Sequence, residues 1–347
     1  SDAYKEIDRT GRHEINTNIF FDVKFMDGLN LETRFGSQYS NSSNDFKGNS
    51  FYGGSASQNG LISKTKTERL SYNFLNLLRY KKTFGVHTVE ALVAHENNEF
   101  KNSVMNASKT NLFDPDGLEL DNAIITQPSS SYTEGSSLES YFAQVNYDYD
   151  GKYFLSGTVR RDGSSKFVNE KWGTFGSVGA TWVVSNEEFM KNQSIFSFLK
   201  LKTSYGITGE QGVTNADGSI NYYPGLDTYT VNNLNDEISL AFVTKGNPDL
   251  TWEKAKQFQV GVEFGLGKYI DASVDYYTKH TTDLIFDRRV GPSLGYALTK
   301  VNDGELLNSG LEFDITAHLL KGNDYFIDLS LNGELPKNEM LKMPIDP

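Results

Sequence analysis

The clearest candidate for chemistry in this sequence is a stretch rich in aromatic side chains, residues 221–229. It combines the rings of Tyr222, Tyr223 and Tyr229 with the amide of Asn221 and the carboxylate of Asp227. Aromatic rings stack on the apolar faces of sugars, while amides and carboxylates form hydrogen bonds with hydroxyl groups. We therefore predict that these five residues bind substrate. The alternative is that they only pack one loop against another.

No residue pattern in the sequence indicates catalysis. The five histidines are scattered singly along the chain, at His13, His87, His95, His280 and His318. The motifs of zinc proteases, serine hydrolases, phosphate-binding loops and dinucleotide-binding folds do not occur. The many carboxylates near the end of the chain are explained by a wet surface without glycosidase chemistry. We therefore predict no catalytic residue, no cofactor and no enzymatic activity.

One acidic run, residues 114–121, carries oxygen ligands of the kind that Ca²⁺ prefers. Its spacing differs from that of an EF-hand loop, so a solvated loop is the favoured interpretation and no metal site is predicted. Whether Ca²⁺ binds there is left open by the sequence.

The elements that must position these residues are predicted to be strands. In residues 139–149, apolar and polar side chains alternate with a period of two, which indicates a strand with one apolar and one polar face. Asp150-Gly151 follows, a dipeptide that tolerates the positive φ angles of a tight hairpin turn. A second alternating stretch, a polar loop and a third alternating stretch complete the unit by Trp182.

The same pattern recurs along the whole chain and predicts an all-β, antiparallel fold. We expect strands near residues 13–26, 29–38, 68–81, 86–97, 138–149, 152–162, 173–185, 199–208, 255–266, 268–280, 307–319 and 324–334. Most are longer than the usual ~5–6 residues of soluble strands. A tilted strand needs about 9–11 residues to cross a bilayer.

Connections of two lengths alternate between these strands. Short turns fall at 27–28, 82–85, 150–151, 267–268 and 321–323, and long loops at 39–67, 98–137, 162–172, 209–254 and 281–306. The connection 185–198 is an exception on the short side, where Ser185 is predicted to cap one helical turn with Glu188 three residues on. Short turns on one side and long loops on the other are typical of outer-membrane barrels.

Charge is segregated between the two faces of the predicted strands. In residues 255–266 the alternate positions from Phe258 to Leu266 are uncharged, whereas Glu263 lies on the opposite face. A Lys or Arg facing lipid at mid-bilayer costs roughly 2–4 kcal/mol. We therefore predict that Val262 and Phe313 face lipid and that Glu263 and Glu312 face a wet interior. The alternative is an antiparallel sandwich or a soluble sheet with one solvated face.

The composition supports strands and excludes several classes of protein. The 347 residues are 13% aromatic and include 31 Gly but only 8 Pro, a composition that suits strands and turns. The absence of Cys excludes disulfides and Cys-based zinc sites. A net charge of -12 argues against nucleic-acid binding, and no apolar run approaches the ~18 residues of a membrane helix.

Several motifs follow one another over about residues 139–335. They are Val145-Asn146-Tyr147, Gly151-Lys152-Tyr153, Arg160-Arg161-Asp162-Gly163-Ser164-Ser165, Trp172-Gly173-Thr174-Phe175, Trp182 with Glu188-Phe189-Met190, Leu199-Lys200-Leu201-Lys202, Ser204-Tyr205-Gly206-Ile207-Thr208-Gly209-Glu210-Gln211, Asn247-Pro248-Asp249-Leu250-Thr251-Trp252-Glu253 and Asn308-Ser309-Gly310-Leu311-Glu312. Together these motifs resemble those of the SusC/RagA-type TonB-dependent outer-membrane transporters of Bacteroidetes.

The resemblance implies an up-and-down transmembrane β-barrel of about 22 strands around a plugged lumen. This chain supplies about twelve of them. Residues 1–347 are then expected to be part of one TonB-dependent receptor barrel domain, an internal piece of its wall. The plug domain, the signal peptide and the closing C-terminal strand are expected to lie outside this chain.

The resemblance also implies import of a glycan, an oligosaccharide or a peptide across the bacterial outer membrane. A SusD-like lipoprotein is the expected lid. The TonB–ExbB–ExbD complex is the expected energy source, acting through parts of the protein outside this chain. The alternative function is an all-β surface protein that binds glycans or mediates adhesion without transport.

Overall fold

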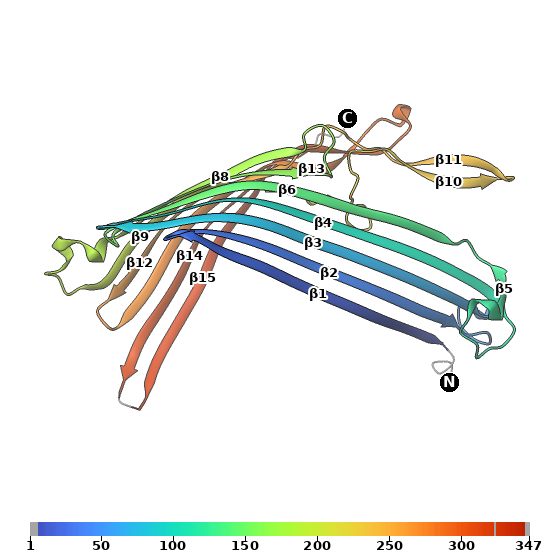
Figure 1. Cartoon of the computed structure of the whole chain (residues 1–347), viewed down its shortest axis with the longest axis horizontal. Coiled ribbons are helices and arrows are strands. Elements are labelled where there is room, and N and C mark those ends of the chain that lie inside the picture. Colours follow the sequence, from blue (N-terminus) through green and yellow to red (C-terminus); the bar gives the residue numbers. More distant parts are fainter. Residues whose placement is uncertain (1–5, 323, 344–347) are drawn as a thin grey trace. The chain divides into compact units, whose positions relative to one another are not determined.

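The computed structural model describes residues 6–322 and 324–343, whose longer elements are all β-strands (Figure 1). Twelve strands follow one another in chain order in one sheet. They are β1 (Ile7–Met26), β2 (Leu29–Gly48), β3 (Leu61–Phe84), β4 (His87–Leu112), β6 (Ser130–Tyr149), β7 (Tyr153–Ser164), β8 (Trp172–Val183), β9 (Phe196–Glu210), β12 (Glu253–Leu266), β13 (Ile270–Arg289), β14 (Leu298–Lys321) and β15 (Phe326–Lys342).

All twelve predicted strands are therefore confirmed, but several are longer than predicted. Strand β2 continues to Gly48 and β4 to Leu112, so much of the predicted loops 39–67 and 98–137 is strand instead. The predicted loop 281–306 is likewise mostly β13 and β14. The extensions of β2 and β4 are rich in Ser, Asn and Thr on both faces. The period-two signal is lost there because neither face is apolar, while the backbone hydrogen bonds continue.

Three short strands were not predicted. Strand β5 (Ala123–Thr126) pairs with β4, and β10 (Thr228–Leu234) pairs with β11 (Glu237–Thr244) in a separate two-stranded sheet. The β10–β11 hairpin turns at Asn235 and Asp236, which both have positive φ. The predicted tight turn at Asp150-Gly151 is confirmed, since these residues have φ angles of 56° and 62°.

The connection between β8 and β9 contains two 3₁₀ turns, η4 (Val184–Asn186) and η5 (Glu188–Met190). The prediction that Ser185 caps a helical turn is wrong. Ser185 lies inside η4, and the residue before η5 is Glu187, whose side chain makes no capping bond. Two tight turns fit the short connection where one capped turn was expected. None of the described residues forms a helix that is long and apolar enough to cross a membrane.

The chain divides into two compact units. The first comprises Ser1–Phe21, Thr33–Leu75 and Glu96–Leu138. Its small core, Ile62, Leu112 and Ala123, lies where β3 begins, β4 ends and β5 begins. In its acidic run, Glu119 pairs with Lys64 at 3.1 Å and Asp121 with Lys109 at 3.8 Å. No group of three or more potential metal ligands occurs in the described part of the chain.

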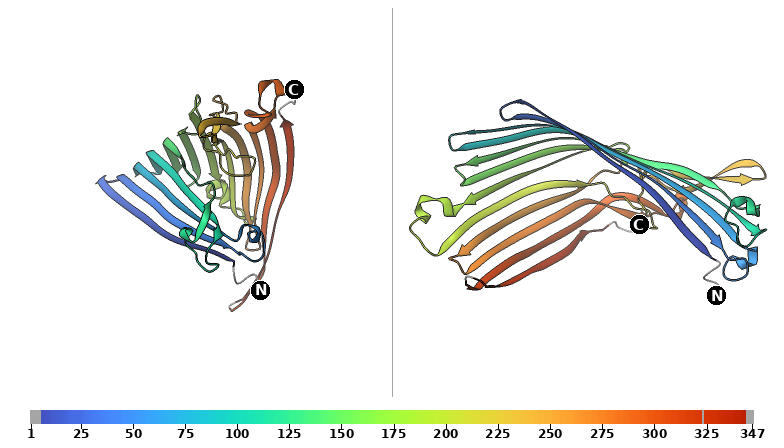
Figure 2. Two further views of the ribbon diagram at one scale, coloured as in Figure 1. Left: turned by 90° about the vertical axis from the view of Figure 1, so that its right-hand side faces the viewer. Right: turned by 60° about the horizontal axis from the view of Figure 1, so that its bottom comes forward.

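The second unit comprises Asp22–Glu32, Asn76–His95 and Glu139–Pro347. Seven of its strands lie side by side in chain order, from green to red, namely β7, β8, β9, β12, β13, β14 and β15 (Figure 2). Val262 is in register with Leu201 on β9 and Val274 on β13, and Val274 is in register with Phe313. Large apolar side chains of this face are exposed, for example Val178, Leu201 and Val260.

The opposite face of these strands holds paired charges. Glu263 accepts from Lys200 at 2.9 Å and lies 3.0 Å from Lys202, which in turn lies 3.0 Å from Asp275. The predicted segregation of Val262 and Phe313 from Glu263 and Glu312 is thus confirmed in the register. An uncovered apolar sheet face of this extent is unusual in water and typical of a surface that contacts lipid.

Aromatic side chains bound this apolar face at both ends. Near the short turns, the ring of Tyr153 stacks on Trp182 with centroids 6.1 Å apart. At the other end, Trp172 lies 6.2 Å from Tyr141. Trp172 and Trp182 occupy the same face of β8, ten positions apart. At about 3.3 Å per residue and a tilt of about 40°, they bound a band roughly 25 Å high, as in a transmembrane barrel.

Candidate functional site

The loops at the long-connection end of unit 2 meet around a small buried core. Trp252, which is 3% exposed, lies with its ring 5.4 Å from those of both Phe167 and Phe175. Leu250 and Val213 are also buried. The indole Nε1–H of Trp252 donates to the carbonyl of Lys171 at 3.1 Å, so the only polar atom of its side chain is satisfied.

Two glycines make room for this core. A Cβ at Gly173 would lie 2.3 Å from the ring of Phe175, and one at Gly209 would lie 2.0 Å from it. Both distances are much shorter than a van der Waals contact. The ring of Phe175 therefore packs directly against the backbone at Gly173 and Gly209. Gly173 and Gly209 each belong to one of the motifs on which the resemblance rests.

Hydrogen bonds tie the same loops together. The backbone N–H of Asn169 donates to the carbonyl of Pro248 at 3.1 Å, and its side-chain amide donates to Asp249 at 2.7 Å. Thr251 and Asn302 exchange two bonds, each of 2.9 Å. Pro248, Asp249 and Thr251 of the motifs therefore fix the backbone of these loops, which is a structural role that the motifs alone did not reveal.

The structure places three of the five predicted binding residues in one turn above this core. The backbone N–H of Asn221 donates to the carbonyl of Val213 at 2.8 Å, and the side-chain oxygen of Asn221 accepts from the N–H of Tyr223 at 2.9 Å. The ring of Tyr223 is 44% exposed. The ring of Tyr222 is half-buried, with the ammonium of Lys166 6.0 Å from its centroid.

Asp227 closes the base of the β10–β11 hairpin. Its carboxylate accepts from the ammonium of Lys245 and from the N–H of Gly246, both at 2.9 Å. The bond from Lys245, followed by that from Gly246, holds the pKa of Asp227 below its usual range. Because this carboxylate accepts two hydrogen bonds within the protein, its first role is structural, namely to link the two ends of the hairpin.

Tyr229 lies on the hairpin itself. Its ring, 56% exposed, meets that of Phe242 edge-on at 5.8 Å, and Phe242 lies 6.4 Å from Tyr296. Further along the same face, Val231 and Leu240 pair across the hairpin and are exposed. The sequence reasoning missed this apolar face, although alternation from Ile238 through Leu240 to Phe242 carried the signal.

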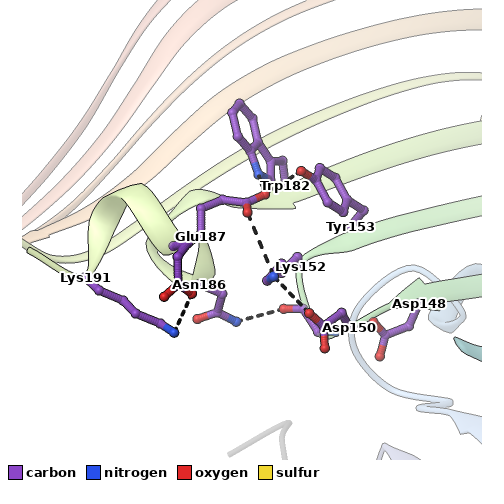
Figure 3. Close-up of polar contacts among 10 residues, drawn as sticks. Asp148, Asp150, Lys152, Tyr153, Trp182, Asn186, Glu187 and Lys191 are labelled. Atoms are coloured by element: carbon purple, nitrogen blue, oxygen red, sulfur yellow. Dashed lines mark hydrogen bonds and ion pairs between the residues drawn. The ribbon is translucent and has the colours of Figure 1, made fainter. Parts of the chain in front are cut away.

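The short-turn end carries a second polar cluster, built around Glu187 (Figure 3). Its carboxylate accepts from the hydroxyl of Tyr153 and from the indole N–H of Trp182, the latter at 3.1 Å. Lys152 lies 2.8 Å from Asp150 and 3.9 Å from Glu187. This cluster joins the turn between β6 and β7 to the connection between β8 and β9, and so fixes the aromatic boundary at that end.

We expect low pH to destabilise the connection between β8 and β9. The bond from Tyr153, with that from Trp182, lowers the pKa of Glu187 from its ordinary 4.5. A carboxylate whose pKa is lowered by folding stabilises the native state above its unfolded pKa, and that contribution is lost as the pH falls through the folded pKa. Amide protection factors in residues 184–193 should therefore fall as the pH drops below the ordinary pKa of 4.5.

Two matched variants distinguish the contribution of Glu187 from that of the adjacent Glu188. Glu187→Gln should show low protection at all pH values and little further loss in acid. Glu188→Gln should behave as wild type, because Glu188 pairs with Lys191 on the exposed surface, where an ion pair contributes little. An acid transition that is unchanged in Glu187→Gln would contradict this assignment.

The sequence matches the family model described as TonB dependent receptor-like, beta-barrel, over residues 2–335. It is 29% identical over 349 residues to TonB-dependent receptor P3 of Formosa agariphila, covering 99% of this chain and 34% of that relative. It is also 29% identical over 339 residues to TonB-dependent receptor SusC of Bacteroides thetaiotaomicron, covering 94% of this chain and 33% of that relative.

Solved structures give the same result. The RagAB peptide importer in its closed-closed state matches with a TM-score of 0.89 and 25% identity, over 99% of this chain and 38% of that chain. The ferric citrate transporter FecA, at 7% identity and a TM-score of 0.55 over 96% of this chain and 44% of that chain, shares the fold alone. This chain spans about a third of the length of the curated relatives it matches.

The resemblance to SusC/RagA-type proteins is confirmed by these matches, which extend it from residues 139–335 to nearly the whole chain. The uncovered apolar face between its two aromatic boundaries is the surface that such a protein presents to lipid. The chain belongs to the family of TonB dependent receptor-like β-barrels of the bacterial outer membrane, a family of receptors rather than enzymes.

Proposed function

We propose that this chain is part of the wall of an outer-membrane importer that takes up glycan fragments, oligosaccharides or peptides with energy from TonB. The observation that carries the proposal is the family match over residues 2–335. The paired charges on the opposite sheet face support it, because a wet passage for polar cargo accepts them at little cost. One similar structure is that of the RagAB peptide importer.

Residues 1–347 are proposed to form part of one barrel domain. The matched relatives are about three times as long as this chain, so the complete protein has room for the rest of the barrel and for a plug. The proposed partners are a SusD-like lipoprotein and the TonB–ExbB–ExbD complex, which the resemblance to SusC/RagA-type transporters implies. The similarity to the RagAB importer and to TonB-dependent receptors supports them.

The loop of residues 221–229 is the proposed binding surface for the cargo. Tyr223 and Tyr229 present exposed rings that can stack on a sugar or a peptide side chain. Asn221 and Asp227 hold the turn and the hairpin that carry these rings, and their remaining acceptor positions are available to hydroxyl or amide donors. The buried core below, with Trp252, keeps the loop in place.

Removal of the two exposed rings should weaken cargo binding. In the full-length transporter, Tyr223→Ala combined with Tyr229→Ala should raise the concentration for half-maximal uptake about tenfold, since each lost stacking contact is worth roughly 0.5–1.5 kcal/mol. The measurement is uptake of labelled oligosaccharides and peptides by cells, with TonB present or deleted.

Tyr269→Ala is the matched control, because Tyr269 is an exposed ring at the short-turn end, far along the strands from this loop. Uptake that persists without TonB would refute active transport. Uptake that needs TonB but is unaffected by the double substitution would leave transport standing and remove this loop as the binding surface.

A further inference from the structure

Lys166 lies in the loop between β7 and β8, beside the turn that carries Tyr222. Its position is fixed from both sides. The backbone N–H of Lys166 donates to the hydroxyl oxygen of Ser164 at 3.2 Å, and the next residue, Phe167, is buried in the core around Trp252. The side chain of Lys166 therefore starts from a rigid backbone.

The ammonium group of Lys166 faces neutral groups. It donates to the backbone carbonyl of Gln211 at 3.3 Å and lies 6.0 Å from the ring centroid of Tyr222. Within the described residues, no carboxylate stands within ion-pair distance of it. Glu210 acts on it only from farther away, and one oxygen of that carboxylate accepts the N–H groups of Gln211 and Gly212 at 2.8 Å.

Three other lysines at this end of the strands each lie beside a carboxylate. Lys245 lies 2.9 Å from Asp227, Lys254 lies 3.2 Å from Asp283, and Lys300 lies 2.9 Å from Asp287. Lys166 is half-buried, and burial lowers its pKa. An ammonium group has three N–H donors, and a partly desolvated cation gains most from an anion that can accept from them.

We propose that Lys166 and Tyr222 form a subsite for a carboxylate group of the imported substrate. The inference rests on the proposed function and adds a chemical class to it, namely carboxylate-bearing cargo. The ammonium of Lys166 donates a charge-assisted hydrogen bond to the carboxylate, and the ring of Tyr222 packs against the apolar atoms beside it. The C-terminal or acidic side chain of a peptide and the carboxylate of a uronic acid share this chemistry.

The test uses two pairs of ligands that differ only in charge. One pair is an oligogalacturonate and its fully methyl-esterified form, and the other is a short peptide with a free C-terminal carboxylate and its amidated form. Binding to the full-length transporter, purified with its lipoprotein partner in detergent, is measured by calorimetry. In at least one pair, the charged member should bind wild type about tenfold or more tightly than the neutral one.

Three variants assign that preference to Lys166. Lys166→Gln should abolish it, while the amide can still donate to Gln211 and keep the loop folded. Lys166→Arg, which keeps the charge, should retain it. Lys171→Gln removes an exposed lysine of the same loop and should leave the preference at its wild-type value.

The outcomes separate this subsite from transport itself. Equal binding of the charged and neutral members, binding of neither charged probe, or a preference that survives in Lys166→Gln would each overturn the proposal. The pair that shows the preference identifies the source as peptide or glycan. TonB-dependent uptake is scored separately, so a failure of the transport proposal appears as uptake without TonB, whatever the charge preference.

Discussion

Val262→Arg is expected to lower the free energy of unfolding of the full-length barrel in a bilayer, by roughly 2–4 kcal/mol at mid-bilayer depth and by less towards the interface, because it places a cation on the lipid-facing surface of the sheet. Val262 lies four positions before the end of β12, within an uninterrupted series of uncharged residues on that face. Its cross-strand neighbours, Leu201 and Val274, are apolar as well. No acidic side chain in register with it can offset the charge.

The matched control is the adjacent residue. Glu263→Gln changes the charge by one unit on the opposite face, where Glu263 pairs with Lys200 and Lys202. These are partly exposed ion pairs, which contribute about 1 kcal/mol or less each. Urea unfolding in lipid vesicles compares the two variants with wild type. Equal losses of stability from the two substitutions would overturn the assignment of faces.

The strands could be predicted from the sequence because a bilayer imposes a local rule. Each residue that faces lipid must be apolar whatever its distant neighbours are, so alternation along one strand, as from Phe258 to Leu266, is sufficient. That rule ends where the membrane ends. The extensions of β2 to Gly48 and of β4 to Leu112 are held by backbone hydrogen bonds, which leave no trace in side-chain polarity.

The candidate site could be predicted only in part, because its geometry depends on residues far apart in the chain. The tyrosines of residues 221–229 were found from composition alone. The core that supports them joins Phe167, Phe175 and Trp252, which come together only because β7, β8, β9 and β12 are neighbours in the sheet. The structural role of Asp227 could not be predicted either. It depends on the ion pair with Lys245, which follows the second strand of the hairpin.

Lys166 shows the same limit. In the sequence it is one lysine among many, preceded by two serines and followed by Phe-Val. Its distinction is the absence of a carboxylate within ion-pair distance in the described structure, together with its half-buried position beside Tyr222. Neither property is visible without the loops in place, since charges of both signs are frequent in this part of the chain.

Trp252→Ala is expected to release the binding loops while leaving the barrel intact. Replacing a buried Trp with Ala costs about 3–5 kcal/mol through lost contacts and the cavity that remains. Here the loss falls on the packing with Phe167 and Phe175 and on the bond to the carbonyl of Lys171. The ladders between neighbouring strands do not run through this side chain, so the sheet should stay paired.

Hydrogen exchange and heat-modifiable mobility in gels measure the two parts separately. In Trp252→Ala, the amides of residues 163–171 and 247–251 should exchange much faster, and the affinity for cargo should fall. The shift in gel mobility on heating should be retained. Trp182→Ala is the control, because it removes a Trp from the opposite end of the sheet together with a bond to Glu187. That variant should leave the loops protected. Loop protection that survives in Trp252→Ala would show that the hydrogen bonds of Asn169 and Asn302, rather than the aromatic core, hold the binding surface in place.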